Sequence, residues 1–194
     1  MLEKIALRLT SYMIEQGVVA HEDAEIYVYG WKMLLFSVGS FSSILLVGFF
    51  LGQLWGTALF LLFFTFLRSY AGGYHANTFS QCFLTTITIY TCCLLLHSYL
   101  PELYWDLAVS VFLLMSIFIT YRWAPIDHPN KPFRGQQKQI LKELSRIVVL
   151  SQTLILLVLR VWQPWLQQYL LWAALAMAVA SLTLLYVIYH PYKK

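Results

Sequence analysis

Long apolar runs, separated by short polar segments, fill most of the chain after residue 32. Residues 33–67 carry no charged side chain. This stretch is too long for one ordinary membrane span and fits two short ones, with a break expected near residues 48–53. Further apolar runs cover about 82–96, 103–123, 147–159 and 165–189. The pattern predicts an all-α polytopic membrane protein with about six transmembrane helices within residues 33–189.

Residues 1–30 form the only long polar stretch before the first predicted span. Apolar residues recur in it near helical spacing, with charged residues off that stripe; they are Leu2, Ile5, Leu9, Tyr12 and Met13. This predicts an N-terminal amphipathic helix that ends at about Gly17. The helix could lie at the membrane interface, on the cytoplasmic side, or pack against the rest of the protein. The pattern alone leaves both arrangements open.

Composition excludes an ordinary soluble domain, and the placement of charge indicates orientation. The chain is 60% hydrophobic and 11% charged, whereas a soluble domain carries about 25% charged residues. Basic residues precede the first span, follow the second, fill a loop at 125–146 and follow the last span. Because cytoplasmic loops are rich in Lys and Arg, six spans with both termini in the cytoplasm place all of them inside except Arg160. We therefore expect one integral membrane domain, residues 1–194, in a cell membrane.

The connection between the second and third spans holds the most reactive side chains. It reads Arg68-Ser-Tyr-Ala-Gly72-Gly73-Tyr-His75-Ala-Asn77-Thr-Phe-Ser-Gln-Cys82. A Cys thiolate is a nucleophile, and a His can take its proton and later protonate a leaving amine. On one continuous helix His75 and Cys82 would lie about 10 Å apart along the axis, so a joint role requires a bend between them. An N-cap at Thr78 or Ser80 would place Cys82 in the first turn of the third span, where the helix dipole favours a thiolate.

Other residues of this connection could support such a site. Gly72 and Gly73 allow close backbone approach, Arg68 could hold a carboxylate or a carbonyl, and Asn77 could orient the imidazole. The residues alone equally allow an interfacial histidine beside an inert apolar cysteine. Zinc is a further alternative, although one His and one Cys are two ligands short of a typical site. The chain contains no GxxxxGK, HExxH or GxSxG motif, and no cofactor or metal is expected.

Several polar residues outside this connection receive structural interpretations. Cys92 and Cys93 fall in mid-span and are expected to be apolar filler, and the threonines of the third span to bond within their helix or to neighbouring helices. His97 and His128 are expected to be solvated. The alanines of the last span allow close packing, either within the chain or in a homodimer; they are Ala173, Ala174, Ala176, Ala178 and Ala180.

The basic loop at 125–146 first of all indicates which segments of the chain lie in the cytoplasm. It could also attract an acidic peptide tail or anionic lipid. The candidate residues for that role are Lys131, Arg134 and Lys138.

The string Arg68…Gly72-Gly73-Tyr-His75-Ala…Cys82 resembles the signature of the accessory gene regulator protein B (AgrB) family. The members of this family are bacterial membrane cysteine endopeptidases of quorum sensing. Tyr29-Gly30 before the first span and Ala124-Pro125…Asn130-Lys131-Pro132 after the fourth also agree with the family. The resemblance therefore covers essentially the whole chain.

This resemblance implies an activity, a substrate and residue roles. Cys82 would be the nucleophile and His75 the general base and acid, with Arg68 and Gly73 supporting the site. A short amphipathic propeptide, similar to AgrD, would be cut near its C-terminal end to leave a thioester on Cys82. A Cys or Ser of the peptide would then close a thiolactone or lactone ring without ATP. The implied partners are this propeptide and membrane lipids, and not nucleic acid.

A non-enzymatic exporter or scaffold for a peptide is the alternative function. Such a protein would tolerate the loss of Cys82. It would depend instead on polar residues that line a path, such as Gln152 or Gln167.

Overall fold

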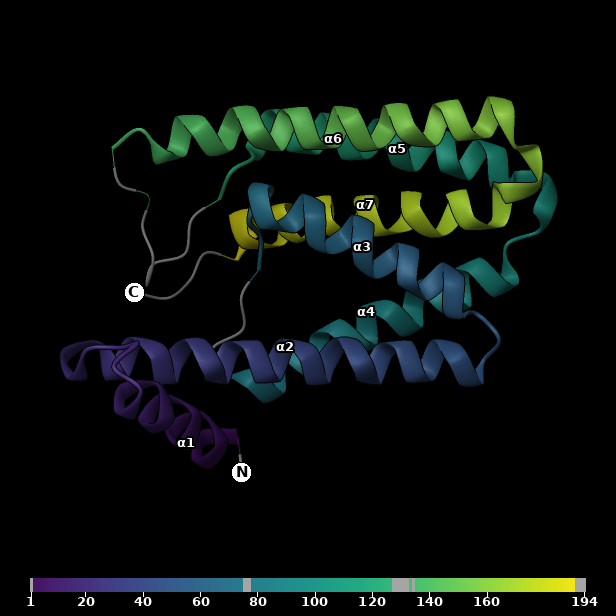
Figure 1. The fold of residues 1–194 in the computed structure, drawn as a ribbon. Coiled ribbons are helices and arrows are strands. Elements are labelled where there is room, and N and C mark those ends of the chain that lie inside the picture. The colour runs from purple at the N-terminus through teal and green to yellow at the C-terminus, as the bar shows by residue number, and fades with distance from the viewer. Residues whose placement is uncertain (1, 75–77, 127–132, 134, 191–194) are drawn as a thin grey trace. The chain divides into compact units, whose positions relative to one another are not determined.

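The computed structural model describes residues 2–74, 78–126, 133 and 135–190. These residues form seven α-helices (Figure 1): α1 (Leu2–Glu15), α2 (Ala24–Phe50), α3 (Leu54–Ala71), α4 (Phe79–Tyr99), α5 (Trp105–Trp123), α6 (Gln137–Trp162) and α7 (Gln167–Tyr189). Helices α2 to α7 are long and apolar enough to cross a membrane. The predicted all-α fold with six candidate spans is therefore confirmed over the described part of the chain.

The break between the first two spans falls where the sequence predicts it. Helix α2 ends in a Schellman motif, in which Gly52 has a φ of +69°. The backbone N–H of Gln53 donates to the carbonyl of Gly48 at 2.7 Å, and that of Gly52 to Phe49 at 3.0 Å. These bonds satisfy carbonyls that a helix end leaves unpaired. A glycine at this position ends the helix inside the uncharged stretch, although hydropathy does not change there.

Several helices extend beyond their predicted bounds. Helix α2 already begins at Ala24 and α3 continues to Ala71, outside the uncharged stretch 33–67. Helix α4 continues to Tyr99, one turn past the end of the apolar run. Helix α6 begins at Gln137, well before Ile147, so the second half of the predicted basic loop is helical. Lys, Glu, Gln and Arg are strong helix formers, and a hydropathy pattern cannot detect the helical turns that they form outside the apolar region.

The chain forms two compact units, Met1–Val47 and Gly48–Lys194. In the first unit the Nζ atom of Lys32 on α2 lies 2.6 Å from the Glu3 carboxylate on α1. The hydrogen bond and charge of Lys32 lower the pKa of Glu3. Helix α1 stops at Glu15, two residues before Gly17, near which the sequence predicts its end. Its location at a membrane interface stays a prediction.

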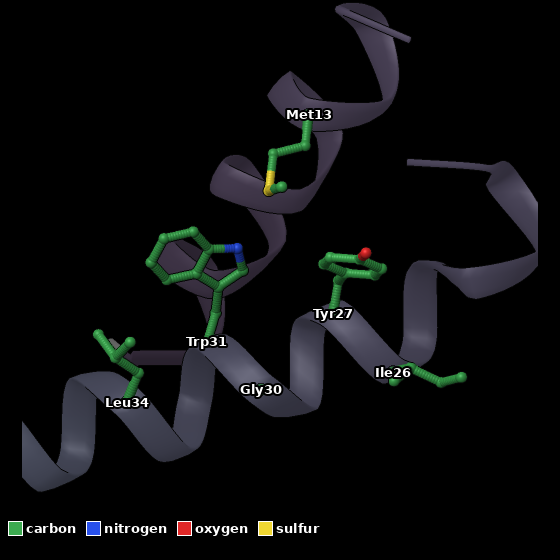
Figure 2. Close-up of a pocket in the computed structure, with 6 residues that line it drawn as sticks. All are labelled: Met13, Ile26, Tyr27, Gly30, Trp31 and Leu34. Atoms are coloured by element: carbon green, nitrogen blue, oxygen red, sulfur yellow. The ribbon is translucent and has the colours of Figure 1, made fainter. Parts of the chain in front are cut away.

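The two helices of the first unit line an open apolar pocket. The side chain of Met13 on α1 points toward Tyr27 and Trp31 on α2 (Figure 2). With Ile26, Gly30 and Leu34 these residues line about 420 Å³. The pocket contains no cysteine, histidine or carboxylate, so its lining offers no nucleophile or acid–base group of the predicted kind. Much of the predicted apolar stripe stays exposed, whereas Ala6 and Thr10 are buried.

Helix α7 forms the core of the second unit. It packs most closely against α5 and α3, while α6 packs against α3 and α5. The alanines singled out in the last span are all buried, at 2% exposure or less; they are Ala173, Ala174, Ala176, Ala178 and Ala180. Small side chains let helix backbones approach closely. These alanines therefore serve packing inside the chain, the first of the two roles that the sequence left open.

An aromatic cluster joins α7 to α3 and α4. Trp172 is fully buried, and its ring stacks on Tyr90 at 5.9 Å and on His97 at 4.8 Å. Its Nε1–H donates to the side-chain carbonyl of Gln53 at 3.3 Å. The Tyr90 hydroxyl also lies 2.7 Å from the hydroxyl of Thr57 on α3. Stacking and hydrogen bonding thus hold three helices around one indole ring.

The expectation that His97 is solvated is wrong. His97 is only 6% exposed, and its Nε2 atom lies 3.3 Å from the carbonyl oxygen of Gln168, which can accept a hydrogen bond from it. The reason is the extra turn of α4, which keeps His97 on the helix and turns its ring toward α7. His128 lies outside the described residues.

Candidate active site

Cys82 lies in the first turn of α4, as the sequence predicts. Thr78 caps this helix: its backbone is extended, and its hydroxyl oxygen accepts from the Gln81 N–H at 3.3 Å. The Cys82 N–H makes the first bond of the helical ladder, to the carbonyl of Thr78 at 3.0 Å. Of the two predicted caps, Thr78 is therefore the one used. Cys82 itself is a free, partly buried cysteine.

Cys82 lines a small pocket formed by three helices and the connection before α4. The lining residues are Arg68, Tyr74, Cys82, Thr85, Thr86, Ile89 and Thr183. The hydroxyls of Thr85 and Thr86 donate to carbonyls one turn back in α4, each at 2.8 Å. The predicted bonding of these two threonines within their helix is confirmed, and they also form one wall of the pocket. Arg68 and Cys82, fourteen positions apart in the sequence, are brought to the same site.

Arg68 holds the backbone of the connection. It lies in the last turn of α3, and its Nη2 atom donates to the carbonyl oxygen of Tyr74, the residue before His75. The guanidinium also lies over the Phe64 ring, 5.4 Å from its centroid. A planar guanidinium combines hydrogen bonding with stacking in a way that Lys cannot. The sequence predicts that Arg68 could hold a carbonyl, and in the structure this carbonyl is that of Tyr74.

Gly72 and Gly73 are enclosed by α5 and α7. Gly72 pairs with Ile126, just after α5, in an isolated parallel bridge, and the Ile126 N–H donates to the Ala71 carbonyl at 3.1 Å. Gly73 has a φ of +134°, and a Cβ atom there would lie 2.5 Å from the Thr183 hydroxyl. The two glycines therefore allow the close backbone approach that the sequence predicted for them.

Sequence reasoning missed Thr183 and Tyr74. Thr183 reaches the pocket from α7, and its hydroxyl donates to the Ala180 carbonyl at 2.7 Å. The Tyr74 ring packs edge-on against Tyr186 of α7 at 5.1 Å. A polar residue within a span is a functional candidate in general, but nothing in the sequence separates Thr183 from Ser181. Only the packing of α7 against α3 identifies it.

Of the five remaining predicted site residues, the structure describes one. His75, Asn77, Lys131 and Arg134 lie outside the described residues. Lys138 is exposed in the first turn of α6.

Basic residues of the second unit gather at the end that contains Cys82. Arg146 of α6 donates to the Tyr121 carbonyl of α5 at 3.3 Å. Tyr121 precedes Ile126, the partner of Gly72 in the bridge, by five residues. Arg160, the predicted exception, lies at the other end of α6. There it pairs with Asp106 at 3.0 Å and donates to Ser110 at 2.9 Å. The two arginines of α6 thus contact opposite ends of α5, and the orientation of the helices in the membrane stays a prediction.

Two of the remaining polar candidates, Cys93 and Gln152, are buried between helices. Cys93 is buried in mid-helix and Cys92 is exposed there. Gln152 is buried, and its amide nitrogen donates to the Phe63 carbonyl at 3.2 Å, so it joins α6 to α3. Among the described residues no three His, Cys, Asp or Glu side chains are grouped as metal ligands.

Replacing Gly73 by Ala should impair the site without preventing membrane insertion. The new Cβ would meet Thr183, and φ would be strained. We expect roughly a 5- to 150-fold loss of the activity of this site, because such strain costs roughly 1–3 kcal/mol and about 1.4 kcal/mol is tenfold. The product is measured by mass spectrometry at matched membrane abundance.

The matched control for this change is Gly39→Ala. Gly39 lies in α2 with open space around its Cβ position, so processing should be retained. Adding Thr183→Ala to Gly73→Ala should restore part of the activity, because it removes the collision but not the strain. Equal activity of Gly73→Ala and wild type would contradict the assigned role.

The fold and this site define a polytopic helical membrane protein with a cysteine–arginine pocket at one end of its bundle. The profile of the Accessory gene regulator B family matches residues 5–187, and the chain belongs to that family. The resemblance seen in the sequence is thereby confirmed. Membership places the chain among multi-pass bacterial membrane proteins with a role in the processing of agr quorum-sensing peptides.

Curated relatives are similar over most of their length. An AgrB-like protein 2 of Clostridium perfringens strain 13 is 26% identical over 166 residues, which cover 83% of this chain and 78% of that protein. An AgrB-like protein of Listeria innocua is 28% identical over 139 residues, covering 70% and 65% respectively. No solved structure shows a significant match.

Proposed function

We propose that the chain is a membrane-embedded cysteine endopeptidase that removes the C-terminal tail of a short quorum-sensing propeptide. The observation that carries this proposal is the position of Cys82. It lies partly buried in the first turn of α4, in a pocket shared with Arg68 and Thr183. A free cysteine at a helix start, beside a cation, has the surroundings of a reactive thiol. Family membership supports the same substrate class.

The proposed reaction has two acyl-transfer steps. The Cys82 sulfur attacks the carbonyl carbon of the scissile peptide bond, the C–N bond breaks, and a thioester joins the remaining peptide to Cys82. His75 takes the thiol proton and gives it to the leaving amine. A thiol or hydroxyl within the peptide then attacks the thioester, closes the thiolactone or lactone ring and returns a proton to Cys82. The thioester keeps the acyl group activated, so no ATP is needed.

Supporting residues act on the geometry of this site. Arg68 holds the Tyr74 carbonyl and so is a positioning residue for the segment that leads into His75. Gly72 and Gly73 let this segment pass against Ile126 and Thr183. Asn77 is the proposed partner that orients the imidazole.

The substrate is captured and cut on the cytoplasmic side of the membrane. The termini and the Cys82 pocket lie on the cytoplasmic side, consistent with the basic residues at that end of the second unit. Lys131, Arg134 and Lys138 would attract the acidic tail of the propeptide before cleavage.

Capture of the thioester tests the reaction. The full chain and its propeptide are co-expressed, the membranes are quenched in acid, and intact mass is measured. Wild type should carry an adduct of the mass of the propeptide without its tail, and neutral hydroxylamine should remove it, because thioesters react with that nucleophile. Peptide mapping should place the adduct on Cys82.

Three results would contradict this proposal. A released tail without any hydroxylamine-sensitive adduct on wild type, at several quench times, would oppose a thioester. An adduct that maps to Cys92 or Cys93 would oppose the assignment to Cys82. Peptide that crosses the membrane uncleaved would favour the exporter or scaffold alternative.

A further inference from the structure

Among the described residues, two arginines at the Cys82 end of the bundle have no acidic partner. Arg122 lies in the last turn of α5, and Arg146 lies in the third turn of α6. The ion pairs within this part of the chain are Lys32–Glu3 and Arg160–Asp106, and neither arginine belongs to one. Because unpaired charges near a bilayer core are costly, the two arginines call for an anionic partner.

Both arginines contact the last turn of α5. Arg146 donates to the backbone carbonyl of Tyr121, the residue directly before Arg122. Its guanidinium lies 4.8 Å from the Tyr121 ring centroid, and that of Arg122 lies 5.7 Å from the Trp123 ring. The Nε atom of Arg146 is buried with no hydrogen-bond partner among the described atoms. Each cation thus lies over an aromatic ring of the last turn of α5, and Tyr and Trp are typical of a membrane interface.

Exposed apolar stripes run from both arginines along neighbouring helices. On α5, Phe118 and Leu114 share a face with Arg122 at four-residue spacing and are 64% and 68% exposed. On α6, Leu150 and Leu154 share a face with Arg146 in the same way and are 44% and 63% exposed. Helices α5 and α6 pack against each other, side by side in Figure 1. Eight residues of helix rise about 12 Å, which is a large part of an acyl chain.

We infer that Arg122 and Arg146 bind the phosphate headgroup of an anionic phospholipid whose acyl chains lie on these two stripes. The headgroup supplies the negative charge, and planar guanidiniums bind phosphate oxygens in a bidentate way. A free acidic peptide would satisfy the charges but leave the apolar stripes unmatched. Basic pockets between transmembrane helices are a known type of lipid headgroup site. This binding does not depend on the chemistry proposed for Cys82.

Lipid titration of the detergent-solubilised full chain tests this site. Native mass spectrometry follows the binding of phosphatidylglycerol and of phosphatidylcholine with identical acyl chains. Wild type should bind phosphatidylglycerol at least about tenfold more tightly, since each interfacial cation adds about a factor of five. The double variant R122Q/R146Q should lose this preference.

The matched control is K138Q/K142Q, which removes the same charge from the exposed start of α6. It should keep the preference for phosphatidylglycerol to within about threefold, because neither lysine is described over an aromatic ring or against α5. Equal losses in both double variants would mean general charge attraction and overturn the site. Displacement of phosphatidylglycerol by an equal concentration of a hexaglutamate peptide would assign the arginines to a peptide instead and also overturn it.

Discussion

Replacing Cys82 by Ala should abolish release of the propeptide tail. We expect a loss of at least about 10⁴-fold, the scale seen when a covalent nucleophile is removed from a protease. The reason is chemical, because Ala has no group that can form the acyl intermediate, and no other cysteine lines the pocket. The released tail is measured by mass spectrometry after co-expression with the propeptide.

Cys92→Ala is the matched control for this experiment. Cys92 lies on the same helix, is exposed in mid-span, and does not line the pocket, so its removal should leave tail release unchanged at equal membrane abundance. His75→Ala should lower release by about 10²–10⁴-fold, the usual contribution of a general base. Undiminished release from Cys82→Ala would end the cysteine peptidase proposal.

Replacing Trp172 by Ala should cause the largest loss of stability. Trp172 is fully buried between α3 and α4 and touches the ring faces of Tyr90 and His97. Gly56 approaches so closely that a Cβ there would lie 2.3 Å from the indole. The groups around the indole have little freedom to move into the cavity that its removal would leave. Truncation should therefore reduce the free energy of unfolding by about 3–5 kcal/mol. Unfolding by increasing mole fractions of dodecyl sulfate in mixed micelles measures this loss.

The control for this change is Trp162→Ala. Trp162 ends α6 and is 78% exposed, so its truncation removes little internal packing. Its unfolding curve should stay close to that of wild type. A midpoint shift in Trp162→Ala as large as that in Trp172→Ala would show that indole loss in general, rather than the aromatic cluster, governs stability.

The sequence predicted the site unevenly. Cys82, Arg68 and the glycine pair could be found because a thiol, a cation and two glycines stand together in a short connection between apolar runs. Thr78 could be predicted as a cap because capping depends on neighbours within one turn. Thr183 could not be predicted, since its role depends on a contact with Gly73 across 110 positions of chain. His97 was misplaced for a similar reason, because its burial depends on α7.

Local physics explains what the sequence by itself determined about this protein. Six apolar segments, the break at Gly52 and the one-sided charge follow from hydropathy, turn chemistry and the cost of placing charge in lipid. Tertiary structure alone decided that α7 is the central helix, that Arg68 holds the Tyr74 carbonyl, and that Arg146 reaches α5. In lipid all helix surfaces are similarly apolar, so hydropathy cannot rank partners, and close packing between particular side chains selects them.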